Sequence, residues 1–163
     1  MKGATPAMVM LERSGIEFAV HAFDHDVADT EGLGYGRAAA HALGVEESRV
    51  FKTLLAQSEK SAVVAIVPVS SQLSLKALAL VLGVKRCEMV PAHDAQRITG
   101  YVVGGISPFG QKKKLLTVVD ESARDFPTIF VSGGRRGIDI EVAPSDLLRV
   151  LDATSGAITA NGA

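Results

Sequence analysis

Residues 62–69, with the sequence Ala-Val-Val-Ala-Ile-Val-Pro-Val, limit how this chain can fold more than any other stretch. The run is wholly apolar and rich in β-branched side chains, so neither of its faces is suited to contact with water. A strand that is apolar on both faces belongs in the middle of a sheet, with other elements packed on each side. The sequence therefore predicts a central strand here.

Short helices and further strands are predicted around this central strand. Thr5 before Pro6 is typical of a helix N-terminus, and glycines end most of the helical patterns. The predicted helices are residues 6–13, 37–43, 73–81, 92–98 and 144–151, and the other predicted strands are residues 16–23, 50–57, 101–103, 115–119 and 128–131. Strands and helices do not alternate strictly, which favours an α+β fold with a mixed, barrel-like sheet surrounded by short helices over a doubly wound fold.

The length of 163 residues is typical of one domain, so we expect a single domain over residues 1–163. Residues 152–163 are expected to form a frayed tail. The chain is 47% hydrophobic and 21% charged, which is close to globular averages and excludes an intrinsically disordered protein.

The charge balance restricts contact with nucleic acid to local patches. Seventeen Lys and Arg residues face eighteen Asp and Glu residues, for a net charge of -1, so no global positive field is present. Two basic clusters remain, one of Lys112, Lys113 and Lys114 and one of Arg135 and Arg136. They are candidate RNA contacts, with a solvated charged face as the alternative.

Cys87 is the only cysteine, which excludes an intrachain disulfide and a cysteine-based zinc site. This fits a reducing compartment, and we expect a cytoplasmic protein. No run of about eighteen apolar residues occurs, so no membrane span is predicted.

Two glycine-rich segments, residues 104–110 and 132–137, each follow a β-like run. Glycines permit positive φ angles and let a ligand approach main-chain N–H and C=O groups, so both are candidate ligand loops; tight hairpin turns are the alternative. The first segment lacks the lysine of a phosphate-binding P-loop, because Gln111 stands there. Residues 32–36 lack the third glycine of a dinucleotide fingerprint, because Arg37 stands there.

Three polar residues stand among apolar neighbours in predicted strands. Lys52 must reach water, a carboxylate or an anionic ligand, and an exposed edge strand is the alternative. Thr53 follows it. Asp139 is expected to point away from Ile138 and Ile140, where it can orient an amino group or Lys52; the polar face of a strand is the alternative.

The sequence gives little support for a metal site or for a side chain that acts as a covalent nucleophile. His21, Asp24, His25 and Asp26 form the only His/Asp cluster, and no second group with metal-ligand spacing completes it. No serine lies in a GxSxG motif, and no partner base can be named for Cys87. We therefore expect neither a metal site nor a covalent nucleophile from the protein.

In combination, these segments resemble the YbaK/EbsC family of aminoacyl-tRNA deacylases, which is related to the editing domain of bacterial prolyl-tRNA synthetases. The resemblance spans nearly the whole chain. It is carried by Thr5-Pro6-Ala7, His21-Ala22-Phe23-Asp24-His25, Phe51-Lys52-Thr53-Leu54, residues 100–108, Gln111-Lys112-Lys113 and residues 131–137.

The resemblance implies a mixed, barrel-like α/β domain that removes cysteine from mischarged Cys-tRNA(Pro). It implies the acceptor end of tRNA(Pro) and prolyl-tRNA synthetase as partners, with no cofactor. It also implies that the substrate's own thiol attacks the ester to form a thiolactone, while the protein mainly positions the substrate.

The resemblance also assigns site residues. Lys52 matches the family's essential lysine, at the terminal phosphate or the leaving oxygen, and Gly104 supplies main-chain contacts. Ser132 and Asp139 match positions that hold the α-amino end. Thr53 and Tyr35 shape the pocket wall, and Phe23 stands where some relatives have tyrosine. Gly105 and Gly133 of the two glycine-rich segments are expected in the substrate pocket, and Lys112, Lys113, Arg135 and Arg136 of the basic clusters are the expected tRNA contacts.

Three other functions stay open. Phe23 lacks the tyrosine hydroxyl of some relatives, and acceptance of one small side chain depends on only about 1 to 3 kcal/mol, so an Ala-tRNA(Pro) deacylase is one alternative. The others are a non-catalytic module that binds tRNA or a synthetase and a carrier of a small anion.

Overall fold

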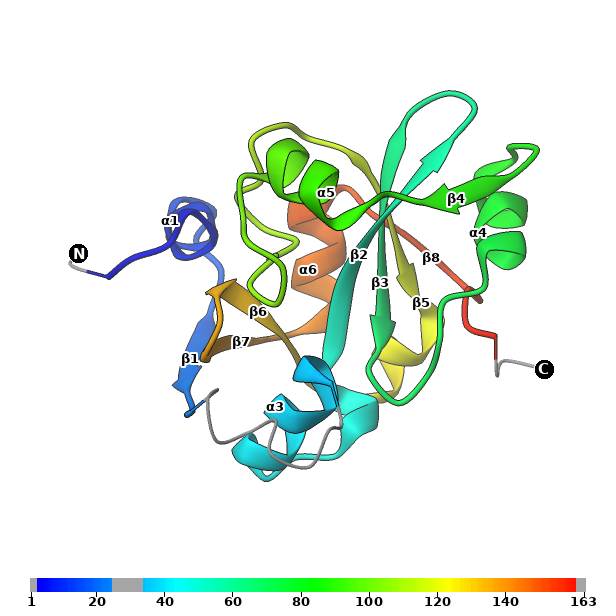
Figure 1. The fold of residues 1–163 in the computed structure, drawn as a ribbon. Helices are drawn as coiled ribbons and strands as arrows, with labels where there is room; N and C mark the ends of the chain where they lie inside the picture. The colour runs from blue at the N-terminus through cyan, green and yellow to red at the C-terminus, as the bar shows by residue number, and fades with distance from the viewer. Residues whose placement is uncertain (1–2, 25–33, 161–163) are drawn as a thin grey trace.

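The computed structural model of the chain describes residues 3–24 and 34–160, in which the strands form two sheets (Figure 1). The larger sheet has the order β4-β2-β3-β5-β8, with β4 (Cys87–Met89), β2 (Phe51–Ser58), β3 (Ala62–Pro68), β5 (Leu116–Asp120) and β8 (Thr154–Gly156). It is mixed, because β2 is antiparallel to β3 and β4 whereas β5 is parallel to β3 and β8. The smaller sheet is antiparallel, with β1 (Phe18–Ala22), β7 (Ile138–Val142) and β6 (Ile129–Arg135).

All five predicted helices are confirmed within the described residues. They are α1 (Pro6–Arg13), α3 (Tyr35–Leu43), α4 (Leu75–Leu82), α5 (Ala92–Thr99) and α6 (Pro144–Leu151), with short 3-10 turns at Glu47–Arg49 and Glu121–Asp125. The Thr5 hydroxyl accepts a hydrogen bond from Met8 N, as expected of an N-cap. None of these helices is long and apolar enough to cross a membrane.

The strand predicted from residues 62–69 is the central strand β3. Val64 and Ile66 pack into one core, which also contains residues of α1 and α6. Val63, Ala65 and Val67 point to the opposite face, where they pack against α4. Figure 1 shows α6 and α4 on the two sides of this strand. The prediction of a strand covered on both faces is therefore confirmed.

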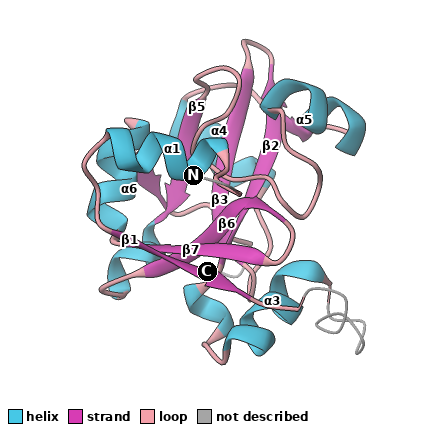
Figure 2. Cartoon of the chain, turned by 90° about the vertical axis from the view of Figure 1, so that its left-hand side faces the viewer, coloured by secondary structure: helices cyan, strands magenta, loops and turns pink. Residues whose placement is uncertain are grey.

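The two sheets pack on a shared core and are joined by one β-bridge among the described residues. This parallel bridge links Val50, just before β2, to Phe130 in β6. Figures 1 and 2 show that β1 and β7 run across β2 and β3 rather than alongside them. The expected mixed α+β class with short helices is confirmed, but the strands form two sheets rather than one closed barrel.

Two local predictions were wrong. Residues 152–160 do not form a frayed tail: β8 pairs with β5, Ile158 is fully buried, and Ala160 N donates to Gln72 O. Residues 101–103 do not form a strand, because the buried Tyr101 instead anchors a loop by donating its hydroxyl to Phe109 O at 2.6 Å. In both cases the conformation depends on contacts outside the segment itself: β8 pairs with the distant β5, and Tyr101 bonds to Phe109 within its own loop.

Candidate active site

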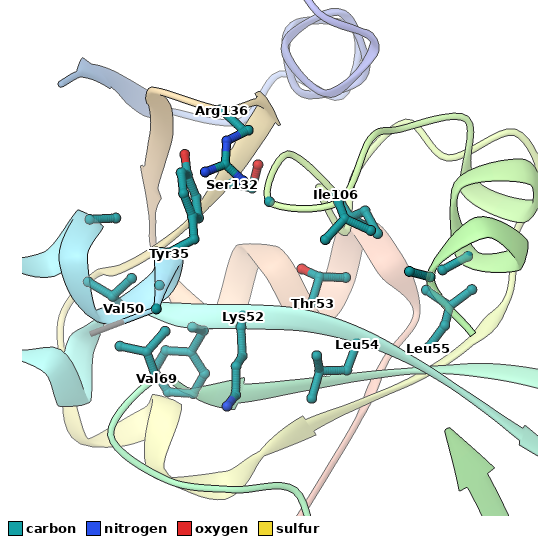
Figure 3. Close-up of a pocket in the computed structure, with 18 of the residues that line it drawn as sticks. Tyr35, Val50, Lys52, Thr53, Leu54, Leu55, Val69, Ile106, Ser132 and Arg136 are labelled. Carbon is teal, nitrogen blue, oxygen red and sulfur yellow. The ribbon is translucent and has the colours of Figure 1, made fainter. Parts of the chain in front are cut away.

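A cavity of about 490 Å³ lies between the first half of β2 and the smaller sheet (Figure 3). Its walls come from the start of α3, from β2, from the segment between β4 and α5, and from the glycine loop that follows α5. β6 and β7 contribute one residue each, Ser132 and Asp139. The volume is that of an ordinary small-molecule site, and the walls are mainly apolar with a few polar groups.

Lys52 lines this cavity from β2 and is half-buried. Its ammonium has no hydrogen bond or ion pair with any described residue. Burial lowers the pKa of Lys52 below its ordinary value, because no carboxylate offsets the loss of hydration. Figure 3 shows the Lys52 side chain leaving β2 on the side opposite Thr53. A partly desolvated, unpaired cation is suited to binding an anionic group of a ligand.

Asp139 faces the cavity from the middle of β7 and is only 3% exposed. As predicted, Ile138 and Ile140 are buried in the core on the opposite face. Burial raises the pKa of Asp139 to about 7, and no described residue gives its carboxyl group a hydrogen bond or an ion pair. The suggestion that Asp139 orients Lys52 is wrong for this structure, in which no ion pair joins the two. An unpaired buried carboxylate is suited to an ammonium group of a ligand.

Ser132 lies directly opposite Asp139 across the β6–β7 ladder, so both side chains point to the same face. The Ser132 hydroxyl accepts a hydrogen bond from Gly134 N at 3.2 Å. The ladder slips between Ser132 and Arg135, so the Gly133-Gly134 pair forms a bulge that bends the strand at the cavity wall.

Thr53 also lines the cavity and is 8% exposed. Within the described part of the chain, its hydroxyl oxygen is the only buried side-chain polar atom that lacks a hydrogen-bond partner. A buried hydroxyl without a partner carries a desolvation cost of about 1 to 3 kcal/mol, which a ligand at this place can offset.

Tyr35, Arg136 and Gly104 form one stacked wall. The Arg136 guanidinium carbon lies 4.3 Å from the centre of the Tyr35 ring, and Gly137 N donates to the Tyr35 hydroxyl at 2.7 Å. Burial is the main cause that raises the pKa of Tyr35. Gly104 packs against the same Arg136 side chain, with a φ of 88°. The wall joins the start of α3 to both glycine-rich segments.

The two glycine-rich segments touch each other through Gly105. A Cβ atom there would lie 2.7 Å from the Cα of Arg135 and 3.0 Å from Arg136 N, so only glycine fits. Gly133 packs in the same way against Ile138, with its Cβ position 2.6 Å from a methyl group. These segments therefore act as a pair, which neither of them shows in sequence alone.

Six of the residues assigned from sequence do not line the cavity, and two of them are Gly105 and Gly133, the contact glycines described above. Phe23 lies behind Tyr35, with ring centres 6.1 Å apart. Lys112 and Lys113 are exposed on the loop before β5, and Arg135 donates to Gly3 O at 3.1 Å. Arg136 is thus the only one of the four predicted tRNA contacts that reaches the cavity.

The predicted His/Asp cluster is only partly visible. His25 and Asp26 lie outside the described residues, and His21 is hydrogen-bonded to Glu141 at 2.9 Å. Residues 3–24 and 34–160 contain no group of three metal-ligating side chains.

Residues 35–150 match the sequence profile of the aminoacyl-tRNA editing domain, which is well over half of the chain. The chain belongs to the aminoacyl-tRNA editing domain family. A protein of Enterococcus faecalis named "Putative Cys-tRNA(Pro)/Cys-tRNA(Cys) deacylase EbsC" is 37% identical over 156 residues, which cover 95% of this chain and 93% of that protein.

The fold of this editing domain recurs in solved structures. The crystal structure of "a putative trans-editing enzyme for prolyl tRNA synthetase" superposes with a TM-score of 0.82 at 22% identity, covering 94% of both chains. A protein described as hypothetical also gives a TM-score of 0.82 at 21% identity, covering 94% of this chain and 99% of its own. At these identities the likeness concerns the fold.

Sequence reasoning missed much of the editing domain's cavity wall. It missed Gly36 at the start of α3, where a Cβ atom would lie 2.6 Å from a methyl carbon of Val69, and it missed the apolar residues Val50, Leu55, Val90, Ala95 and Ile106. These residues come from separate elements and are joined only by tertiary packing. The glycines at positions 34 and 36 were a usable signal, although the dinucleotide motif tested there was the wrong one.

Gly104→Ala tests the stacked wall of the editing domain. The new Cβ would overlap the Arg136 Nη1 atom, so the guanidinium has to shift, and we expect it to lose its position over the Tyr35 ring. We expect the loss of stability common to alanine at positive φ, about 1 to 2 kcal/mol, plus about 0.5 to 1 kcal/mol for the lost cation–π contact. Gly15→Ala is the control, because Gly15 also has positive φ but nothing within 4 Å. Equal losses in urea unfolding of the two variants would contradict the stack.

Proposed function

We propose that this editing domain is a Cys-tRNA(Pro) deacylase that acts in trans on the mischarged 3′ end, in the cytoplasm. One observation carries the proposal: Lys52, Asp139 and Thr53 line one cavity, and no described residue pairs with the Lys52 ammonium, the buried Asp139 carboxyl group or the buried Thr53 hydroxyl. The Lys52 ammonium lies on the opposite side of β2 from the Thr53 hydroxyl, so a ligand that meets both must pass the edge of this strand (Figure 3). An aminoacyl ester on tRNA carries a phosphate, an ammonium group and a carbonyl group within a short span, so it provides complementary groups. The name of the Enterococcus relative supports the choice of cysteine.

Lys52 acts at the terminal phosphate or at the leaving ribose oxygen. Its ammonium is partly desolvated, so its attraction to an anion is stronger than it would be in bulk water. Asp139, with Ser132 beside it, binds the α-ammonium group of the cysteine. These two assignments place positive and negative groups of the protein against opposite charges of the substrate.

The remaining assigned residues shape and extend the site. Gly104 offers main-chain contacts to the aminoacyl group, next to Gly105 and Gly133, which bring the two segments together. Tyr35 and Thr53 form the pocket wall, and Phe23 supports Tyr35 from behind.

The acceptor end of tRNA(Pro) lies along a local basic strip. Arg136 is exposed and lines the cavity, while Arg135, Lys112 and Lys113 are exposed outside its wall. The net charge of -1 limits the footprint to this strip, so a second surface must hold the tRNA body. Prolyl-tRNA synthetase is the proposed source of that surface.

Bond cleavage is assisted by the substrate. The cysteine thiol loses its proton and its sulfur attacks the ester carbonyl carbon, the carbon–oxygen bond to the ribose breaks, and the ribose oxygen takes up a proton. Water then opens the thiolactone. This route suits a cavity in which Asp139 is the only carboxylate among the described lining residues and makes no hydrogen bond to the Ser132 hydroxyl. The protein contributes mainly orientation and charge.

A deacylation panel with Cys-, Ala- and Pro-tRNA(Pro) tests the function. We expect rapid release of cysteine, slow release of alanine because it has no thiol, and no release of proline above the uncatalysed rate. Faster release of alanine than of cysteine would make the protein an Ala-tRNA(Pro) deacylase that uses water. Tight tRNA binding without release of any amino acid would make it a binding module.

A further inference from the structure

Among the strands of the described residues, none pairs with part of one edge of β2. On the side opposite β3, β4 pairs with β2 only at Ala56, Gln57 and Ser58. In the described part of the chain, the only β-bridge between the smaller sheet and this strand joins Val50 and Phe130. Between these two points no ladder formed by residues 3–24 or 34–160 covers residues 52–54, and the cavity lies beside them.

The main chain of Thr53 points to this uncovered edge. Hydrogen-bonding groups of successive residues in an antiparallel strand point alternately to its two neighbours. Val69 N donates to Val50 O, so Val50 faces β3, and Val90 N donates to Leu55 O, so Leu55 faces the other edge. Thr53 lies two residues before Leu55 and therefore presents its N–H and C=O on the same side as Leu55.

The side chain of Thr53 also faces this cavity. Its unpartnered hydroxyl is more than nine-tenths buried. Figure 3 shows the Thr53 side chain pointing from β2 toward the space bounded by Tyr35, Ser132 and Ile106. One residue thus offers a main-chain donor, a main-chain acceptor and a hydroxyl group to a single ligand.

An aminoacyl ester contains the same N–Cα–C=O unit as one residue of a strand. We propose that the aminoacyl group pairs with Thr53 as a one-residue addition to the open edge of β2, which rests on the proposed deacylase function. The α-ammonium group donates to Thr53 O, and Thr53 N–H donates to the ester carbonyl oxygen. An ammonium has three N–H donors, so the same group can also bind Asp139.

This pairing makes Thr53 a specificity-determining residue. Side chains of directly opposed residues lie on the same face of a sheet, with Cβ atoms about 4.5 to 5.5 Å apart. The side chain of the cargo amino acid therefore lies beside the Thr53 hydroxyl, which hydrogen-bonds the sulfur of cysteine. Alanine offers no such partner and leaves the hydroxyl unpaired, as it is in the free protein.

Thr53→Val removes only the hydroxyl, with little change in shape. We expect kcat/KM for Cys-tRNA(Pro) to fall about tenfold and that for Ala-tRNA(Pro) to change less than twofold, while Thr53→Ser keeps the wild-type preference. The melting temperature of Thr53→Val should rise, because an unpaired buried hydroxyl is removed. Thr117→Val is the control: its hydroxyl donates to Leu115 O at 3.0 Å, so this variant should melt lower and keep full activity.

Amide hydrogen exchange tests the main-chain pairing. In the free protein, we expect the Thr53 amide to exchange faster than that of Leu54, whose N–H faces β3. A non-hydrolysable amide analogue of 3′-cysteinyl-adenosine should slow Thr53 exchange at least tenfold and leave Leu54 unchanged. Unchanged Thr53 exchange in the saturated complex, or a Thr53→Val variant with the wild-type Cys/Ala ratio, would overturn the pairing. Wild-type protein that releases no cysteine would instead overturn the deacylase function on which it rests.

Discussion

Replacement of Lys52 by methionine is expected to lower kcat/KM for Cys-tRNA(Pro) by about 10² to 10³-fold, the range found when one preorganised electrostatic group is removed. Lys52 is half-buried in the cavity and its ammonium has no partner among the described residues, so its charge is available to a phosphate or to the leaving oxygen. Methionine keeps the apolar stem and removes the charge. Steady-state deacylation assays at fixed salt measure the effect.

The fold of Lys52→Met should be intact. Burial lowers the Lys52 pKa, so the folded state binds its proton less tightly than the unfolded state, and this group reduces stability at neutral pH. The variant should therefore melt at or above the wild-type temperature. Lys60→Met is the control, because Lys60 is exposed and outside the cavity, and it should keep full activity. A folded Lys52→Met protein with wild-type kcat/KM would remove Lys52 from the site.

Asp139→Asn is expected to lower kcat/KM by about 10² to 10³-fold and to change its dependence on pH. The carboxyl group is 3% exposed and burial raises its pKa to about 7, so in the wild type the ionised form increases as the pH rises through 7. Only that form attracts the α-ammonium group. The substrate's own amino group titrates in the assay of either protein and affects both alike. A rise of kcat/KM through pH 7 that occurs in the wild type and not in Asp139→Asn therefore reports the ionisation of Asp139.

The same group should make folding stability fall with rising pH. The folded pKa, about 7, lies above the ordinary value of 3.8, so the stabilising effect is complete below pH 4 and is lost as the pH rises through 7. The loss is up to about 4 kcal/mol by pH 8.

In urea unfolding, Asp139→Asn should be more stable than wild type at pH 8, with a smaller difference at pH 5. Asp120→Asn is the control, because Asp120 accepts three hydrogen bonds and should lose stability at both pH values. If the stability that Asp139→Asn gains over wild type were smaller at pH 8 than at pH 5, the raised pKa of Asp139 would be contradicted.

Elements with strong local signals could be predicted from the sequence. The apolar run of β3 and the Thr5-Pro6 start of α1 depend on neighbouring residues, and both are found where expected. β8 depends on β5, a partner far along the chain, and the loop at Tyr101 depends on a side-chain hydrogen bond to Phe109, eight residues on; local strand and helix patterns show neither contact. The sequence predicted one barrel-like sheet, whereas the strands form two sheets. Local patterns could not show this, because the order of strands in a sheet depends on long-range pairing.

The site followed the same division. Lys52, Asp139, Ser132 and Gly104 were singled out in the sequence, and the structure places them around one cavity. The missing ion pair between Lys52 and Asp139 could not be foreseen, because it depends on the directions in which β2 and β7 present their side chains. The open edge of β2 at Thr53 was equally hidden, since it results from where β4 begins to pair and where β6 ends its contact.

The most direct test of the account is the single-turnover release of cysteine from Cys-tRNA(Pro) by the wild type and by the Lys52→Met, Asp139→Asn double variant. The cavity and its charges predict that the wild type accelerates release at least about 10²-fold over the uncatalysed reaction, and that the folded double variant returns it nearly to that baseline. Equal release by the two proteins, or no acceleration by either, would contradict the assignment of this cavity as the deacylation site.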